Sequence, residues 1–490
     1  MSFFRQLLCT VVVSYSCLTL GVTFTWPSST LLLFRSENTT LHRPMTETEQ
    51  ALLGSLSSIG AMIATPIAGF LSDVKGRKFC MVMMSLMHVI CWSMIITSNR
   101  VEVVLTAMFV SGIGCGAYFV TPVYISDFCQ ESIRGQMTSG AVVFYAIGFG
   151  EIDPIGTIVS YIVGGFLDYF KNVYACLGIS VLGVILLSLM KESPLFLMIK
   201  GREEEAKESL AFFRNVSPDS KEVLQEVETI RRGLNPEMDE PGTPEEECKL
   251  KPISEKNSSL LQFIINGIQF KFFFPGKSYS TRRALATAIV LMTLSIFQGL
   301  IVVQVYAEPL FTEAIPSMSP TISSILFSTV TFVVGLVTAY LTDIVGRKPL
   351  MLYSSLAASA CCILLGSQIH LRWAPHSATA VFIYLFCVAY TMGAGTIPYV
   401  TSPELFLPEV KSFANMLVTE WIWLCTFIIL FLFQPLVSVI GLGPVFYIFA
   451  VICLASAVFT HFCLPETKGL PVDEIQALFS KKRTRSSNYA

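Results

Sequence analysis

Two octapeptides of nearly the same sequence place charged side chains at equal spacing in distant parts of the chain. They read LSDVKGRK at 71–78 and LTDIVGRK at 341–348, and each ends one apolar run and begins another. A charge beside apolar chain is costly unless it is paired, and a carboxylate can bond an Arg or the free N–H groups of a helix end. The pattern therefore predicts paired charges at two helix junctions, where Gly76 and Gly346 permit a tight turn.

Further charges repeat in the same order along both halves of the chain. Each octapeptide is followed by an acid–base pair seven residues apart and, after more apolar runs, by a glutamate. The predicted charge sites are Asp73, Gly76, Arg77, Lys78, Asp127, Arg134 and Glu192, then Asp343, Gly346, Arg347, Lys348, Glu404, Lys411 and Glu466. A single copy fits a topology anchor and turn. Two copies in register favour an inner gate that latches the halves in one conformation and releases them in another.

Two amide side chains, Gln298 and Gln304, interrupt the apolar run 284–307. Polar groups are costly in lipid, so these amides either face a cavity or hydrogen-bond a neighbouring helix. In a cavity they would bind the polar groups of a small solute.

The composition places the chain in a lipid bilayer. It is 53% hydrophobic and 14% charged, and 31 of its charged residues lie between Lys191 and Arg283. Soluble proteins carry about 25% charged residues. No basic domain suggests nucleic acid as a partner. The fourteen Cys lie mostly in apolar runs without ligand spacing, which favours buried side chains over metal ligation. No catalytic set or phosphate-binding loop is evident, so we expect neither an enzyme nor a cofactor.

Twelve apolar runs are long enough to span a membrane, which takes about 20 residues. They lie at roughly 7–34, 52–72, 79–98, 103–125, 137–167, 173–190, 284–307, 321–342, 350–369, 378–401, 413–438 and 443–464. The first is too long for the core of a secretory signal peptide. We predict an all-α membrane protein of twelve transmembrane helices in two six-helix halves. The predicted segments are 1–190 and 284–464, a linker at 191–283, and a tail at 465–490.

The linker has two predicted parts. Residues 200–232 mix charges at helical spacing with an apolar face at Leu210, Phe212 and Phe213, which predicts short amphipathic helices. Residues 233–259 are rich in Pro and acidic residues, which predicts a disordered segment.

Lys and Arg gather on the side of the linker, which predicts that both termini are cytoplasmic in a multi-pass protein of the cell membrane. The first loop then lies outside, where Asn38 of Asn-Thr-Thr is a glycosylation candidate.

Four segments resemble the motifs of the major facilitator superfamily and, within it, the sugar porter family. They are PVYISD at 122–127 with Arg134-Gly135, KESPLFL at 191–197, GAGTIPYVTSPELF at 393–406, and PETKG at 465–469. The stretch VQVYAEPLF at 303–311 is similar to the insect facilitated trehalose transporter-like branch. The resemblance covers the chain and implies the major facilitator fold.

This resemblance implies facilitated (uniport) transport of a hexose or trehalose by alternating access. It adds Tyr399 and Trp423, at the positions of the family's span-10 and span-11 Trp, to Gln298 and Gln304 as substrate-binding candidates. We expect a monomer. Span 1 has Thr23 where proton-coupled relatives have an Asp, which favours passive transport.

Several family amides are missing. The departures from the family pattern are Ser295, Ile296, Ile301, Val142 and Ile422 at amide positions, with Val74 and Met108 at Arg positions. Two alternatives therefore stay open: a solute sensor that does not transport, and a facilitator of a less hydroxylated solute.

One stretch, GFGEIDPIG at 148–156, places Glu151, Asp153 and Pro154 inside the fifth predicted span. Without Phe149–Gly156 the sequence would read FYAIGTIVSY, an uninterrupted helix. The stretch is thus an inserted segment, a looped break near an interface, or a functional carboxylate pair.

Overall fold

The computed structural model describes residues 2–130, 154–234, 279–314, 318–470 and 472–480, and the regular elements in these ranges are helices. They are α1 (Ser2–Arg35), α2 (Glu47–Lys75), α3 (Arg77–Thr97), α4 (Val101–Gly114), α5 (Gly116–Phe128), α7 (Pro154–Phe166), α8 (Tyr169–Ser188), α9 (Pro194–Ile199), α10 (Glu203–Arg214), α11 (Lys221–Leu234), α13 (Tyr279–Ile296), α14 (Leu300–Val305), α15 (Ala307–Ala314), α16 (Pro320–Val345), α17 (Arg347–Leu371), α18 (His376–Met392), α19 (Ile397–Glu404), α20 (Pro408–Ile440), α21 (Leu442–Cys463) and α22 (Val472–Ser480).

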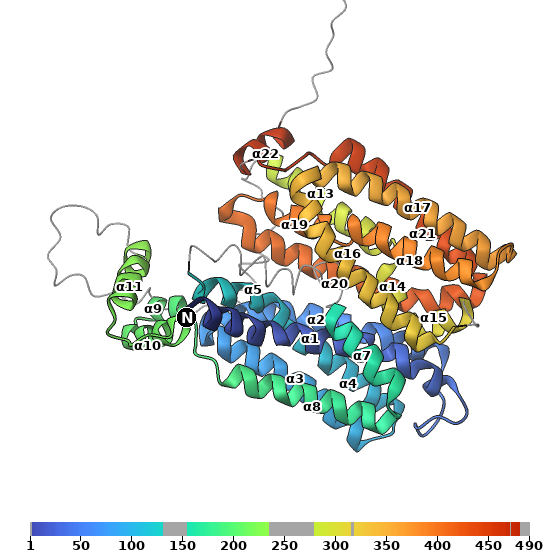
Figure 1. Cartoon of the computed structure of the whole chain (residues 1–490), viewed down its shortest axis with the longest axis horizontal. Helices are drawn as coiled ribbons and strands as arrows, with labels where there is room; N and C mark the ends of the chain where they lie inside the picture. Colours follow the sequence, from blue (N-terminus) through green and yellow to red (C-terminus); the bar gives the residue numbers. More distant parts are fainter. Residues whose placement is uncertain (1, 131–153, 235–278, 315–317, 471, 481–490) are drawn as a thin grey trace, which may run out of the picture.

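Ten helices of the described chain are long and apolar enough to cross a membrane. The places of the fifth and seventh predicted spans are taken by α7 and by α13 with α14 and α15. Figure 1 shows α1–α8, in blue to green, beside α13–α21, in yellow to red. The predicted all-α membrane fold in two halves is therefore confirmed.

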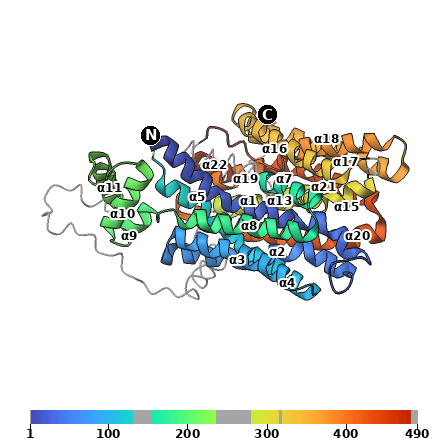
Figure 2. The same cartoon turned by 60° about the horizontal axis from the view of Figure 1, so that its bottom comes forward.

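The helices α9–α11 project from one end of the bundle, near the start of α1 (Figure 2). At this end α22 also packs on the bundle, where Arg283 donates to the Phe479 carbonyl and Gln476 to the Leu405 carbonyl. We call this end the linker end, and the other the opposite end. The tail helix α22 lies within a segment predicted only as a tail.

Three predicted spans are broken rather than continuous. The fourth bends at Cys115 between α4 and α5, and the tenth breaks between α18 and α19. The seventh ends α13 at Ile296 and restarts at Leu300, because Gly299 takes a left-handed conformation at φ 95°. Its missing side chain leaves room for the Phe449 ring, which a Cβ would approach to 2.5 Å. Breaks of this kind form substrate sites in transporters, and this one lies directly after Gln298.

Small residues allow close helix packing where lipid supplies no hydrophobic force between helices. The buried positions of α2 are mostly Ala, Ser and Gly, and this helix packs against α4 in its own half and α20 in the other.

The short helices of the linker dock on the N-terminal half. Arg214 of α10 is buried, donates to the Phe128 carbonyl over 2.8 Å, and pairs with Glu226 of α11. The neighbouring Phe213 stacks on Phe128 with ring centroids 4.5 Å apart. Helices α10 and α11 cover most of 200–232, and of the predicted apolar face Leu210 and Phe213 are buried while Phe212 is half-buried.

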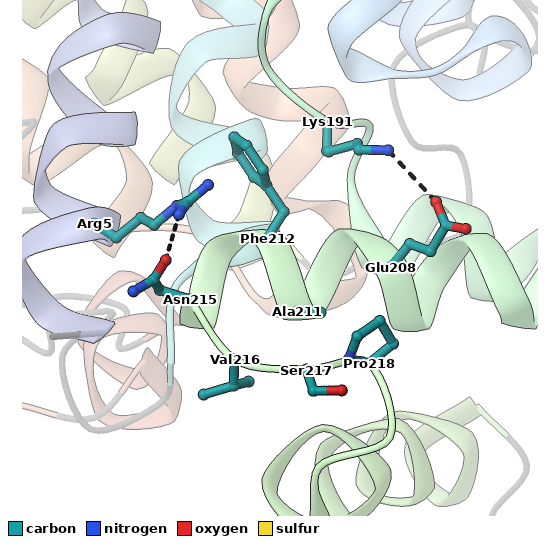
Figure 3. Close-up of a pocket in the computed structure, with 9 residues that line it drawn as sticks. All are labelled: Arg5, Lys191, Glu208, Ala211, Phe212, Asn215, Val216, Ser217 and Pro218. Atoms are coloured by element: carbon teal, nitrogen blue, oxygen red, sulfur yellow. Dashed lines mark hydrogen bonds and ion pairs between the residues drawn. The ribbon is translucent and has the colours of Figure 1, made fainter.

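A hollow lies where α10 meets the start of α1, and Figure 3 shows its lining. Arg5 donates to Asn215 and lies over the Phe212 ring, while Lys191 pairs with Glu208 over 3.5 Å. The charged side chains that line this hollow are paired with neighbouring side chains of its lining. The hollow is therefore part of the contact surface between α1 and α10.

Candidate functional site

The charges predicted in the N-terminal half meet at the linker end. Arg77, in the first turn of α3, lies between two carboxylates: its Nε is 3.0 Å from Asp127 Oδ2, and its Nη1 is 3.4 Å from Asp73 Oδ1. Asp127 is 6% exposed and also accepts the Ser193 hydroxyl over 2.7 Å, whereas Asp73 is 67% exposed. The buried Asp127 is therefore the principal partner of Arg77.

The C-terminal half repeats this arrangement with equivalent residues and partly different atoms. Arg347 Nη2 is 2.9 Å from Glu404 Oε1, and Nη1 is 3.4 Å from the exposed Asp343. Glu404 Oε2 accepts the Thr467 hydroxyl over 2.6 Å, as Asp127 accepts that of Ser193. We call these two sets the N-network and the C-network. Glu404 is 30% exposed, so the C-network is the more solvated copy.

A glutamate from the end of each half completes each network by capping a helix. Glu192 accepts the backbone N–H of Lys78 over 3.0 Å, and Glu466 accepts those of Arg347 and Lys348, each over 3.0 Å. These N–H groups open α3 and α17, where a helix favours negative charge. Burial opposes ionisation of Glu466, yet the N–H groups of Lys468, Arg347, Lys348 and Thr467 together lower its pKa.

Both predicted glycines are required for two reasons, their backbone conformation and the space next to their Cα atoms. Gly76 has φ 109° and Gly346 has φ 99°, a region that side chains disfavour. A Cβ would also lie 2.3 Å from Glu192 Oε2 at Gly76, and 2.8 Å from Glu466 Oε2 at Gly346. The absent side chain therefore makes room for the capping carboxylate.

The structure does not describe the side chains of two predicted members of the networks. Arg134 lies outside the described residues, and Lys411 lies in α20 with a side chain that the structure does not describe. Among the described residues, the ion pairs of each network stay within one half. In the conformation seen here, they tie together the helices of a half.

Bonds between the halves lie elsewhere. Tyr161 of α7 donates its hydroxyl to the Gln304 carbonyl over 2.6 Å, and the Glu308 N–H donates to the Ser28 hydroxyl of α1 over 2.9 Å. Both involve the part of the seventh span beyond its break at Gly299. No sequence pattern points to Tyr161 or Ser28.

The predicted amides are buried next to that break. Gln298 has no exposed surface, and its Oε1 accepts the Cys453 thiol over 3.4 Å, a weak bond. Within the described chain, Gln298 Nε2 and Gln304 Oε1 have no hydrogen-bond partner. Buried polar atoms without partners are rare in folded proteins and call for an explanation.

The predicted aromatic residues Trp423 and Tyr399 lie in two different environments. Trp423 of α20 packs on Phe24 of α1 with ring centroids 5.8 Å apart, a contact that crosses between the halves. Tyr399 of α19 is buried in an apolar cluster with residues of α13 and α20. Both rings are under 10% exposed in this conformation.

Sequence reasoning passed over one carboxylate close to these residues. Glu420 lies in α20, three residues before Trp423, and its Oε1 is buried without a hydrogen-bond partner among the described residues. Its spacing from Trp423 places both on one face of the helix, which the sequence alone could have revealed.

Comparison with known proteins identifies the class of protein. The family model described as "Sugar (and other) transporter" matches residues 7–479, so the chain belongs to this family. It is a major facilitator superfamily transporter and not an enzyme.

Curated relatives and solved structures agree with this family. The facilitated trehalose transporter Tret1 of Bombyx mori is 26% identical over 99% of this chain and 88% of its own length. Tret1 of Drosophila grimshawi is 24% identical over 99% of this chain, which spans about half (49%) of that protein. The inward open xylose transporter XylE from E. coli superposes with a TM-score of 0.73 at 19% identity, over 96% of this chain and 98% of XylE.

Proposed function

We propose that this transporter carries a sugar, a hexose or trehalose, down its gradient as a uniporter. The proposal starts from membership of the sugar transporter family and from its alternating-access mechanism. The similarity to facilitated trehalose transporters supports the choice of sugar and of passive transport.

The observation that carries the proposal is the pair of networks at the linker end. Each ties the end of one long helix to the start of the next and to a segment beyond the last helix of its half. Such ties make each half a rigid unit, as alternating access requires of halves that rock about a central site. In other conformations the same charges serve as the predicted inner gate.

The central amides are the proposed sugar contacts. Gln298 Nε2 would donate to a sugar hydroxyl and Gln304 Oε1 would accept from one, which satisfies both atoms. Trp423 and Tyr399 would stack on the ring once the halves move apart. Since Ile301 and Ile422 replace two family amides, the site offers fewer contacts to hydroxyls.

Topology is part of the proposal. The bias of Lys and Arg favours a cytoplasmic linker end and an outer loop between α1 and α2, in the cell membrane. Asn38 is exposed in that loop. Glycosidase treatment should shift the electrophoretic mobility of the protein, and Asn38→Gln should remove the shift. If Asn38 carries no glycan, the proposed glycosylation is wrong, and the topology has to be tested by tagging the loops.

Radiolabelled trehalose and glucose influx in oocytes, with surface expression measured, tests the function. A second chain lacking Phe149–Gly156 belongs in the same experiment. Of that stretch, Glu151 and Asp153 lie outside the described residues, and Pro154 begins α7. Flux in both chains supports the proposal, and flux in the deletion alone shows that the stretch blocks transport.

Absence of flux in both chains at normal surface levels would contradict the proposal. The lost amides favour one second candidate, a facilitator of a less hydroxylated solute, which flux of such a solute would show. Binding without flux would show a sensor.

A further inference from the structure

Glu420 is the feature that sugar transport leaves unexplained. It lies in the membrane span Phe413–Ile440, about two helical turns from the start of that span. Its Oε1 is buried and has no hydrogen-bond partner among the described residues. A carboxylate held in a membrane span is costly and as a rule faces a pathway or a charged partner.

The neighbours of Glu420 along α20 contact the N-terminal half on one side and an apolar cluster of the C-terminal half on the other. Trp423, one turn after it, packs on Phe24 of the N-terminal half. Leu417, one turn before it, packs on the apolar cluster that contains Tyr399. Residues three apart on a helix are neighbours, so Glu420 lies one turn from Trp423, a proposed aromatic contact of the substrate.

Among the described residues, the helices that pack most closely on α20 supply no evident counter-charge at this level. Helices α2, α13, α14, α19 and α21 pack against α20. The Lys and Arg residues of these five helices are Lys75, in the last turn of α2, and Arg282 and Arg283, in the first turns of α13. Arg283 donates to the Phe479 carbonyl at the linker end. A cation for Glu420 would therefore come from the solute.

We infer that Glu420 is a cation-binding residue of the pathway and that the preferred solute is an amino sugar in its ammonium form. This inference rests on the proposed function and narrows its substrate class. A carboxylate binds an ammonium by a charge-assisted hydrogen bond, and the face of a nearby indole attracts the same cation. The exchange of family amides for Ile301 and Ile422, together with the carboxylate of Glu420, shifts recognition from hydroxyls to positive charge.

The test compares labelled glucosamine and glucose influx in the full chain and three variants, at pH 6.5, where the amine is protonated. The variants are Glu420→Gln, Glu420→Asp and Glu313→Gln. Glu313 is an exposed carboxylate of the same half, so its variant is the control for lost charge. Loss of a charged hydrogen bond corresponds to roughly a tenfold to hundredfold change in affinity.

We expect Glu420→Gln to raise the KM for glucosamine at least about tenfold and that for glucose less than about twofold. Glu420→Asp should restore part of the preference, and Glu313→Gln should leave it unchanged. Glucosamine should also raise the Tm of the purified protein, and Glu420→Gln should abolish that shift.

Three results would overturn the inference. If both sugars move and the variants keep the ratio of their KM values, Glu420 does not select the solute, while the proposed function stands. If glucose influx carries protons in the full chain but not in Glu420→Gln, the carboxylate binds a proton instead. If neither of these sugars moves, trehalose influx decides whether the proposed function stands, and an unchanged Tm with glucosamine removes this inference.

Discussion

The carboxylates of the two networks at the linker end and the polar groups at the centre of the bundle differ in how fully they are hydrogen-bonded, although Arg347 Nε of the C-network is also buried without a partner among the described residues. In the networks, Asp127, Glu404 and Glu466 each accept two or more bonds from nearby donors. At the centre, Gln298, Gln304 and Glu420 keep buried polar atoms without a partner in the described chain. The saturated groups hold the structure together, and the unsaturated ones are available to a solute.

The largest expected effect comes from breaking the more buried network. Arg77→Ala leaves Asp127 buried without its cation, and such losses cost about 3–5 kcal/mol. Arg347→Ala should cost roughly half as much, since Glu404 is more exposed and remains solvated. Thermal unfolding of the purified proteins measures both, and equal shifts would contradict the difference between the two copies.

The next effect concerns the glycines that admit the capping carboxylates. Gly76→Ala places a side chain at positive φ and against Glu192, so we expect a loss of about 2–3 kcal/mol from strain and a displaced cap. Gly346→Ala, with its longer contact to Glu466, should lose less. The same unfolding assay measures this pair, and a silent Gly76→Ala would rule out the cap as described.

A smaller effect is expected at the central amide Gln298, where substitution should change substrate affinity but not protein stability. Gln298→Leu should raise the KM for the transported sugar about threefold to tenfold and leave Tm unchanged, because its Nε2 has no described partner in the protein. Gln368 is the matched control: it is buried and bonds both the N–H and the carbonyl of Ala374. Gln368→Leu should lower Tm and keep KM, and the reverse pattern would contradict the assignment.

The smallest effect is a pH dependence of the C-network. The pKa of Glu466 is lower in the folded protein, so its contribution to stability is present above the ordinary Glu pKa of about 4.3 and is lost as the pH falls further. Glu466→Gln should lower Tm at pH 7 by more than at pH 3.5. Glu474→Gln, at an exposed site, should shift Tm little at either pH.

Much of the fold could be predicted from the sequence, because a span needs a long apolar run and the charges between runs repeat. The breaks in three spans could not, since they depend on contacts such as that of Gly299 with Phe449. The sequence predicts Lys78 and Lys348 as cations of the gate, whereas in the structure Glu192 and Glu466 bond their backbone N–H groups. Which residues cap a helix depends on where a distant segment returns.

Some residues of the proposed central site are visible in the sequence. Gln298 and Gln304 stood out because amides are rare in an apolar run, and the structure buries both. Glu420 also stands out in an apolar run, but the family pattern does not name its position. The bonds of Tyr161 and Ser28 depend on how the halves meet, which sequence spacing does not encode.

Counterflow in proteoliposomes tests the central claim, passive alternating access by a sugar, most directly. Vesicles loaded with unlabelled sugar and diluted into a trace of labelled sugar, without a proton gradient, should accumulate label transiently above equilibrium. Gln298→Leu should weaken this overshoot. Gln368→Leu should preserve it when equal amounts of folded protein are compared. Uptake that rises only to equilibrium, or that requires a proton gradient, would contradict the account.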